Sequence, residues 1–276
     1  MRVLFCGVRG STPAPGADFV AVGGHTSCVA ISRRRAAPSL VLDAGTGLRR
    51  LTEALDGAAF RGTILLTHLH WDHTQGLPFF AAGDREDARV TLAMPAQGPA
   101  EAVLAGAMSP PHFPIGPDGL LGSWRFVGVE PGEHEIEGFA VLAAEIPHKG
   151  GRTFGYRIVE DGRAGLAYLP DHGPLGAGPG PDGLGARHDA ALDLAGRVDV
   201  LVHGGQFTID QAERAADFGH ATVEYAVRLA EEAGVGRLVL SHHDPSRTDA
   251  QVESILAGLS ARVPVTAATE GLELTI

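Results

Sequence analysis

Cysteine is scarce in this sequence, which contains only Cys6 and Cys28. Two cysteines are too few for a disulfide framework. Neither stands in a CxxC pair, so nothing points to zinc binding or redox chemistry at paired thiols. We therefore expect both to be small buried residues.

Long hydrophobic runs are also absent. No stretch approaches the roughly 18 uninterrupted apolar residues that a membrane-spanning helix needs. Residues 1–7 (MRVLFCG) pass straight into a glycine turn and do not continue into the apolar core of a signal peptide. These features predict no membrane contact and a cytoplasmic location.

Basic residues are outnumbered, with 22 Lys and Arg against 33 Asp and Glu, for a formal net charge of −11. An extended polyanion such as folded RNA is therefore disfavoured as a partner, although nucleic acid is not excluded. The sequence also lacks any repeat or low-complexity tract, so a repeat architecture or a disordered chain is not expected.

The 276 residues, 44% of them hydrophobic, are enough for a sizeable core, and one domain over residues 1–276 is the simplest interpretation. Short apolar or β-branched runs alternate with segments of helical spacing, which predicts two sheets with helices outside. The expected strands are residues 2–6, 27–32, 40–42, 63–66, 90–94, 124–129, 139–146, 153–159, 165–169, 198–202 and 237–240. The expected helices are residues 48–55, 100–107, 221–233 and 250–259.

Two segments rich in glycine and proline, residues 108–117 and 174–185, interrupt this pattern and predict surface loops. Loops of this kind are either plain connections or lids over a site. The first contains His112 and Phe113, which favours a lid.

Four side chains that can bind metal follow the buried strand at residues 63–66, in the segment THLHWDH: His68, His70, Asp72 and His73. If the chain stays extended past the strand, His68, His70 and Asp72 face one side and His73 lies where the chain begins to coil. Imidazole and carboxylate ligands suit zinc, and manganese or iron also fit. The alternative is a polar turn without a metal.

Three further ligand-type residues follow other expected strands: His148, Asp171 and His242. One such histidine alone is more often a capped or exposed residue than a ligand. Together with the first cluster, the three predict a dinuclear metal site.

Several motifs together resemble the metallo-β-lactamase superfamily, and within it the branch of ribonuclease Z-like and cyclic-nucleotide phosphodiesterase-like proteins. The motifs are residues 7–13 (GVRGSTP), residues 42–47 (LDAGTG), the HxHxDH cluster followed by Gly76, and Ser241-His242. The resemblance runs nearly from end to end of the chain. It implies an α+β fold, a four-layer αββα sandwich with metals at one edge between the sheets.

The resemblance also implies the ligand set of two divalent ions. It makes His68, His70 and His148 ligands of one ion, and Asp72, His73 and His242 ligands of the other. Asp171 becomes the bridging carboxylate, and a bridging water completes the site. Many proteins that resemble this chain are dimers, so a homodimer is also expected.

A proton donor is implied by the same resemblance. The ribonuclease Z-like branch uses a histidine in a Gly-His-Ser-Thr element, and this chain has Gly219-His220-Ala221-Thr222. His220 is therefore the candidate general acid, with a capping or surface histidine as the alternative. Gly204 stands where ribonuclease Z has an acidic residue that supports the donor, which weakens this assignment.

Other residues are candidates for orienting a ligand or touching substrate. Asp43 is expected to orient a metal-bound imidazole, with a structural turn as the competing interpretation. His25 occupies a place where the resembling proteins often have asparagine. The remaining candidates are His112, His203, His243 and Asp244.

Two divalent ions with two carboxylates and one hydroxide leave a local charge of about +1, which favours a small anionic substrate. The leading hypothesis is therefore hydrolysis of a small phosphodiester, such as a cyclic nucleotide, by a metal-bridging hydroxide, with Asp72 and His220 as catalytic residues. The alternatives are tRNA 3′-end processing, hydrolysis of a lactone or thioester, and a metal-binding regulatory protein with little turnover.

Overall fold

Two sheets of seven strands each form the centre of the molecule, whose computed structural model describes residues 1–34, 36–163 and 165–276. The first sheet has the order β14-β1-β2-β3-β4-β5-β6. Its strands are β1 (Arg2–Gly7), β2 (Cys28–Ser32), β3 (Leu40–Leu42), β4 (Arg61–Leu65), β5 (Arg89–Pro95), β6 (Ser123–Val129) and β14 (Glu273–Thr275). Strands β3 to β6 run parallel, whereas β14, β1, β2 and β3 pair antiparallel.

The second sheet has the order β13-β12-β11-β10-β9-β8-β7. Its strands are β7 (Gly132–Ile136), β8 (Phe139–Glu145), β9 (Phe154–Val159), β10 (Leu166–Leu169), β11 (Val200–Gly204), β12 (Leu238–Ser241) and β13 (Val265–Ala267). Strands β10 to β13 are parallel, and β7 to β10 are antiparallel. The two sheets therefore share one plan, a parallel half joined to an antiparallel half.

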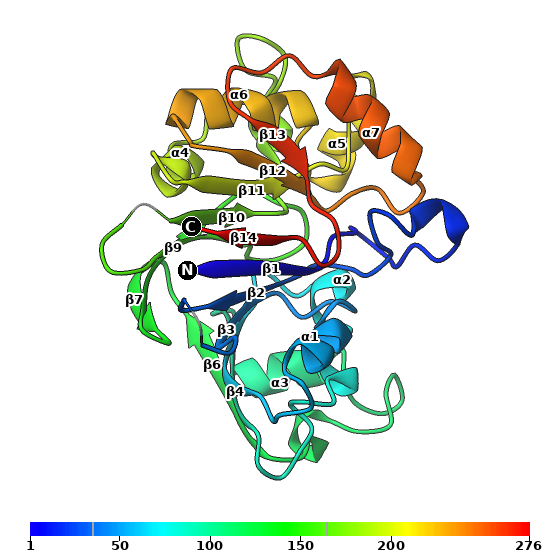
Figure 1. Cartoon of the computed structure of the whole chain (residues 1–276), viewed down its shortest axis with the longest axis vertical. Helices are drawn as coiled ribbons and strands as arrows, with labels where there is room; N and C mark the ends of the chain where they lie inside the picture. Colours follow the sequence, from blue (N-terminus) through cyan, green and yellow to red (C-terminus); the bar gives the residue numbers. More distant parts are fainter. Residues whose placement is uncertain (35, 164) are drawn as a thin grey trace.

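Helices cover the outer face of each sheet (Figure 1). They are α1 (Leu48–Ala54), α2 (Trp71–Thr74), α3 (Ala100–Ala105), α4 (Asp189–Ala195), α5 (Ala212–Phe218), α6 (Val223–Ala233) and α7 (Asp249–Gly258). In Figure 1, α1 and α3 lie to the right of strands β3, β4 and β6 of the first sheet, α4 and α6 lie above the second sheet, and α2 lies where the sheets meet. Within the described residues, no helix combines the length and apolar character needed to cross a membrane.

Three apolar clusters hold these layers together. The central one joins the two sheets and includes Phe5 and Tyr156, both fully buried. The second packs Leu48 of α1 against the first sheet, and the third packs Leu194 of α4 and Leu229 of α6 against the second. Burying an apolar face on each side of both sheets produces the layer order helix, sheet, sheet, helix. This arrangement confirms the expected αββα sandwich.

The sequence pattern missed six short strands and α-helices: β7, β13, β14, α2, α4 and α5. Strands β7, β13 and β14 are edge strands of their sheets. Their side chains are partly exposed, which weakens the alternation of hydrophobic and polar residues that predicts a strand. Helix α5 buries only Ala215, which gives no helical stripe to detect. The expected helix at 221–233 begins instead at Val223, because the Thr222 side chain caps it by accepting from Tyr225 N.

The chain does not stay extended through Asp72, as the sequence interpretation assumed. Strand β4 ends at Leu65, and helix α2 begins at Trp71. Asp72 and His73 therefore project from the first turn of a helix. That turn, not the alternation of a strand, separates their side chains from those of His68 and His70.

Arg9 is a buried residue that links loops of the two sheets by hydrogen bonds, a role that we call a strut. Its guanidinium donates to Gly23 O at 2.7 Å, Arg247 O at 2.8 Å and Asp244 O at 3.1 Å, and the side chain is fully buried. Its backbone forms isolated bridges with Thr26 on one side and His243 on the other. The motif GVRGSTP thus ties the loop after β1 to the loop after β12.

Replacing Arg9 by alanine is expected to lower the free energy of unfolding by about 3–5 kcal/mol, because three buried carbonyl oxygens would lose their donor. Chemical denaturation monitored by circular dichroism measures this change. The exposed Arg187, whose side chain retains 66% exposure, is the matched control, and its alanine variant should change stability little. Equal effects for the two variants would contradict a strut role for Arg9.

Candidate metal centre

Seven side chains with metal-binding atoms converge at one edge between the sheets. They follow the ends of four strands: β4, β8, β10 and β12. The carboxyl ends of parallel strands in such folds commonly carry the functional residues. The seven are His68, His70, Asp72, His73, His148, Asp171 and His242.

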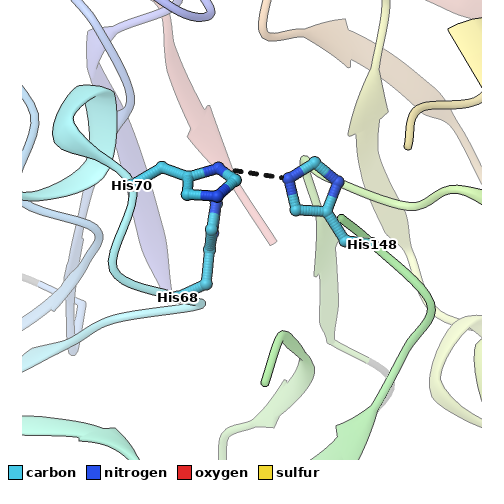
Figure 2. Close-up of side chains that lie close together, drawn as sticks. All are labelled: His68, His70 and His148. Atoms are coloured by element: carbon cyan, nitrogen blue, oxygen red, sulfur yellow. Dashed lines mark hydrogen bonds between the residues drawn. The ribbon is translucent and has the colours of Figure 1, made fainter. Parts of the chain in front are cut away.

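The first half of this centre contains His68, His70 and His148, whose ligand atoms lie within 4.8 Å of one another. Figure 2 shows His68 and His70 on one loop facing His148 on another, with His148 Nε2 lying 3.3 Å from His70 Nδ1. His148 Nδ1 lies 2.6 Å from Gly219 O, an acceptor, so Nδ1 carries the proton. The lone pair on His148 Nε2 therefore points at His70.

Gly219 allows this contact because it ends α5 with a left-handed φ of 77°. A Cβ atom on Gly219 would lie 2.6 Å from Lys149 N, closer than real Cβ atoms approach backbone. The bare glycine lets the two chains pass closely enough for its carbonyl to orient His148.

The second half contains Asp72, His73 and His242, which again lie within 4.8 Å of one another. His73 Nε2 is 3.3 Å from His242 Nε2, and His242 Nε2 is 3.1 Å from Asp72 Oδ2. The Ser11 amide donates to Asp72 Oδ2 at 2.6 Å and holds that carboxylate in place. All three side chains are buried.

Asp171 lies between the two halves. Its Oδ2 is 3.0 Å from His73 Nε2, and its Oδ1 is 3.3 Å from His242 Nε2 and 3.9 Å from His148 Nε2. The same carboxylate groups with His68 and His73 as a third set of metal-binding atoms. This position fits a carboxylate shared between two ions.

The electrostatics of the centre fit a resident cation. Burial would lower the pKa of His73, but the carboxylates of Asp72, Asp43 and Asp171 raise that pKa well above its usual value. Burial would likewise lower the pKa of His242, and Asp171 and Asp72 raise it. Nearby positive charge therefore stabilises the buried carboxylates, and a divalent ion would supply that charge.

An unpaired buried atom points the same way. His68 Nε2 is buried without a hydrogen-bond partner among the described residues. An unpaired buried polar group is costly unless an ion or another ligand satisfies it. Burial also keeps the pKa of His68 well below its usual value, which leaves a neutral imidazole able to bind metal.

Asp43 orients His73 directly and His68 through Thr67. Its carboxylate accepts from Thr67 N at 2.7 Å, His73 Nδ1 at 2.8 Å and Tyr168 OH at 3.0 Å. Thr67 Oγ1 also donates to Asp43, so it accepts from His68 Nδ1 at 3.1 Å. Both histidines are thereby held with Nδ1 directed at these acceptors, which leaves Nε2 as the atom that can bind a metal.

Replacing Asp43 by asparagine is expected to weaken metal affinity by about 10–100-fold, because the amide cannot hold His73 and His68 in these tautomers as firmly. Titration with zinc in a competing chelator measures the change. Tyr168→Phe removes only the phenol donor and should have a smaller effect in the same direction. Unchanged affinity in Asp43→Asn would show that Asp43 serves only the turn.

His220 lies at this centre too. Its Nδ1 is 3.3 Å from Asp171 Oδ1, and it forms a fourth set of metal-binding atoms with His148 and Asp171. Burial lowers its pKa to about 3. The geometry therefore allows two roles for His220, a proton donor beside the metals or a further ligand.

Four histidines singled out from the sequence lie outside the four sets of metal-binding atoms among the described residues. His25 contacts Thr46 Oγ1 at 3.3 Å, and His112 lies on the loop after α3. His203 is buried 3.3 Å from His172, and burial lowers the pKa of His203 to about 4. His243 is buried against Ala268 O, and burial lowers its pKa to about 3. Roles for these four residues at the centre stay predictions.

Asp244, the last such candidate, accepts from Ser246 N at 2.8 Å and so forms a local turn.

Sequence reasoning missed several partners of the site: the Ser11 amide, Thr67, Tyr168 and the Gly219 carbonyl. Two of these are backbone groups, which leave no side-chain signature. Thr67 adjoins His68, and its hydroxyl could have been recognised as a partner. Tyr168 lies on β10, shortly before Asp171 in the sequence, but its contact with Asp43 depends on how the two sheets pack.

A pocket of about 380 Å³ opens onto the centre. It is lined by Ser11, Leu69, His70, Trp71, Asp72, His148, Asp171, Phe218, His220 and His242. Neither loop expected from the glycine and proline pattern, 108–117 or 174–185, contributes to this lining. The 108–117 loop borders a neighbouring cavity instead, so a lid over the metal pocket stays a prediction.

Comparison with known proteins gives matches of three kinds. The sequence pattern of the beta-lactamase superfamily domain matches residues 39–243. A ribonuclease Z from Salinibacter ruber is 29% identical in an alignment of 283 positions that covers 84% of each chain. Two solved structures are similar along nearly their whole lengths: a diphosphatase from the PhnP family (TM-score 0.70, 18% identity, 100% of this chain and 97% of that one) and the short form of human tRNase Z (TM-score 0.68, 21% identity, 100% and 99%).

Proposed function

We propose that this chain, which belongs to the beta-lactamase superfamily and is a metal-dependent hydrolase of that fold, hydrolyses a small phosphodiester such as a cyclic nucleotide. The observation that carries the proposal is the position of Asp171 between two sets of imidazole and carboxylate ligands. Two divalent ions held there would leave net positive charge in the pocket, which favours an anionic substrate. Zinc suits these donors best.

In this proposal the chain's own residues hold the ions and orient the substrate. His68, His70 and His148 would hold one ion, and Asp72, His73 and His242 would hold the other. Asp171 would be shared by both. Bound divalent ions supply the positive charge that polarises a phosphoryl oxygen and promotes ionisation of water.

The departing oxygen of the ester needs a proton. We propose that His220 gives it from the imidazole beside Asp171, at a place in the pocket wall that substrate can reach. Gly204 leaves the His220 ring without an acidic partner from that position, and Asp171 is the carboxylate that faces it instead.

The comparisons support the phosphorus-centred chemistry. The relatives are named ribonuclease Z and diphosphatase, and both names denote enzymes that cleave bonds to phosphorus. The pocket of about 380 Å³ is near the small end of the range for ligand sites, which favours a small substrate.

A second candidate function is tRNA 3′-end processing. It is favoured by the ribonuclease Z of Salinibacter ruber, which aligns with 84% of this chain. Against it stand the net charge of −11 and the absence of a Lys- and Arg-rich inserted arm in the sequence.

The test is to load the purified protein with zinc, measure the metal content, and assay five substrates side by side. They are bis(p-nitrophenyl) phosphate, cyclic nucleotides, a precursor tRNA, a lactone and a thioester. We expect about two zinc ions per chain and turnover of the small phosphodiesters.

Precursor tRNA cleaved far faster than the small esters would favour the second candidate. Activity confined to the lactone or thioester would overturn the phosphodiester proposal. Bound metal without turnover of any substrate would point to a regulatory protein.

A further inference from the structure

A second cavity adjoins the metal pocket, and three aromatic side chains dominate it. This cavity, which we call the aromatic pocket, has a volume of about 290 Å³. Its aromatic side chains are Trp71, Phe79 and Phe113, and Leu104 and Met108 close its apolar floor. None of the residues that line it is Asp, Glu, Lys or Arg.

Trp71 belongs to both cavities. It stands between His70 and Asp72 at the start of α2 and lines the metal pocket as well as the aromatic pocket. Trp71 is 75% exposed, although an indole ordinarily packs against protein. Trp71 is therefore a wall that the two cavities share.

The remaining walls present flat faces and two polar edges. Phe79 is 59% exposed, and its ring meets that of Phe113 edge to face with centroids 5.8 Å apart. Gln75 and His112 also line the aromatic pocket. Exposed aromatic faces with a few polar groups at the edge are the arrangement that proteins use to stack and recognise nucleobases.

We propose that the aromatic pocket binds the nucleobase of the substrate, while the phosphate of the same molecule lies at the metal centre. This inference rests on the proposed phosphodiesterase function and names its substrate class as a nucleoside phosphodiester. A volume of about 290 Å³ takes one ring system and leaves no room for an oligonucleotide. The uncharged lining suits a base and excludes a second phosphate.

Phe218, which also lines the metal pocket, is the competing platform. Its side chain is 56% exposed, and the Arg214 guanidinium lies 5.8 Å from the centre of its ring. Phe218 lines the metal pocket but not the aromatic pocket, so it offers one face without an enclosing cavity. The enclosed side beside Trp71 is therefore the better site for a base.

The test compares two ligands that differ only in the base. Adenosine 5′-monophosphate and ribose 5-phosphate are titrated calorimetrically into the zinc-loaded protein. We expect the nucleotide to bind about tenfold more tightly or better, because stacking on an aromatic side chain contributes that much per base. Trp71→Ala should abolish this preference, and Trp71→Phe should keep most of it.

Val20, an apolar residue with the same 75% exposure directly after η1 (Ala17–Phe19), is the matched control, and Val20→Ala should leave both affinities unchanged. Equal affinities for the two ligands in the wild-type protein, including no measurable binding of either, would overturn the pocket assignment. Loss of the preference in Phe218→Ala but not in Trp71→Ala would also overturn it.

The binding measurement separates this inference from the proposed function. A protein that prefers the nucleotide but hydrolyses none of the phosphodiesters would keep the aromatic pocket and lose the proposed activity. A protein that hydrolyses bis(p-nitrophenyl) phosphate without any preference for the nucleotide would keep the activity and lose the pocket.

Discussion

Replacing Asp171 by asparagine is expected to lower phosphodiester hydrolysis by on the order of a thousandfold or more and to reduce bound zinc. The Asp171 carboxylate is buried and lies within 3.3 Å of both His73 Nε2 and His242 Nε2. His242 and His73 keep its pKa well below the usual value despite burial, so it is ionised. Asparagine keeps the volume but offers neither the charge nor two equivalent oxygens for two ions.

Metal analysis and kcat with bis(p-nitrophenyl) phosphate measure the effect. Asp161→Asn is the matched control, since Asp161 has a side chain 58% exposed and a left-handed φ of 53°, which asparagine adopts readily. Thermal unfolding of the metal-free proteins shows whether Asp171→Asn still folds. A folded variant with full zinc content and full rate would exclude Asp171 as a shared ligand.

Much of the centre could be predicted from the sequence because its ligands are close neighbours in the chain or follow recognisable strands. His68, His70, Asp72 and His73 stand together, and His242 comes directly after the apolar strand β12. The family resemblance was confirmed, and so was the αββα sandwich. Which of these side chains bind metal stays a prediction that the geometry favours.

The local backbone could not be predicted so well. His242 and Asp43 have left-handed φ angles of 54° and 61°, conformations that non-glycine residues rarely adopt. Surrounding structure imposes such angles, and a single strand's pattern carries no trace of them. The backbone at Asp72 was also predicted wrongly. Asp72 lies in helix α2, whereas the sequence interpretation placed it on an extended segment after a strand.

Interactions between the two sheets could not be predicted from the sequence either. Tyr168 on β10 donates to Asp43, which follows β3 in the other sheet. Arg9, part of a motif that the resemblance associates with the family, is a fully buried structural residue and not a ligand. Contacts between residues far apart in the chain depend on packing, which periodicity does not report.

His220→Ala is the prediction that separates two roles for one residue. As a proton donor, His220 acts only when the departing oxygen is a poor leaving group. Its loss should then lower kcat by about 10²–10⁴-fold for an alkyl leaving group and much less for p-nitrophenolate, which needs no proton. As a ligand beside His148 and Asp171, its loss should instead reduce zinc content.

The geometry of the ligands favours the first role. The Nδ1 atom of His220 faces Asp171 Oδ1 at 3.3 Å, and its ring is tilted by 45° against that of Phe207 with centroids 5.6 Å apart. Burial lowers the pKa of His220 to about 3 and the Asp171 carboxylate raises it, so the donor role requires the negative charge of Asp171 and of the substrate phosphate to keep the ring protonated. His148 already holds its own Nε2 lone pair towards His70, and that group is complete without His220. We therefore expect His220→Ala to retain the zinc of the wild-type protein.

Measuring zinc content and kcat for paired esters of alkyl alcohol and p-nitrophenol on the same preparation decides between the roles. His134, which lies at the surface with its Nε2 2.8 Å from Glu130 O, is the matched histidine control. A rate loss of equal size for both esters, accompanied by loss of zinc, would reassign His220 as a ligand. A loss confined to the alkyl ester at full zinc content would establish that the metal centre and the proton donor are separate parts of one site that share Asp171.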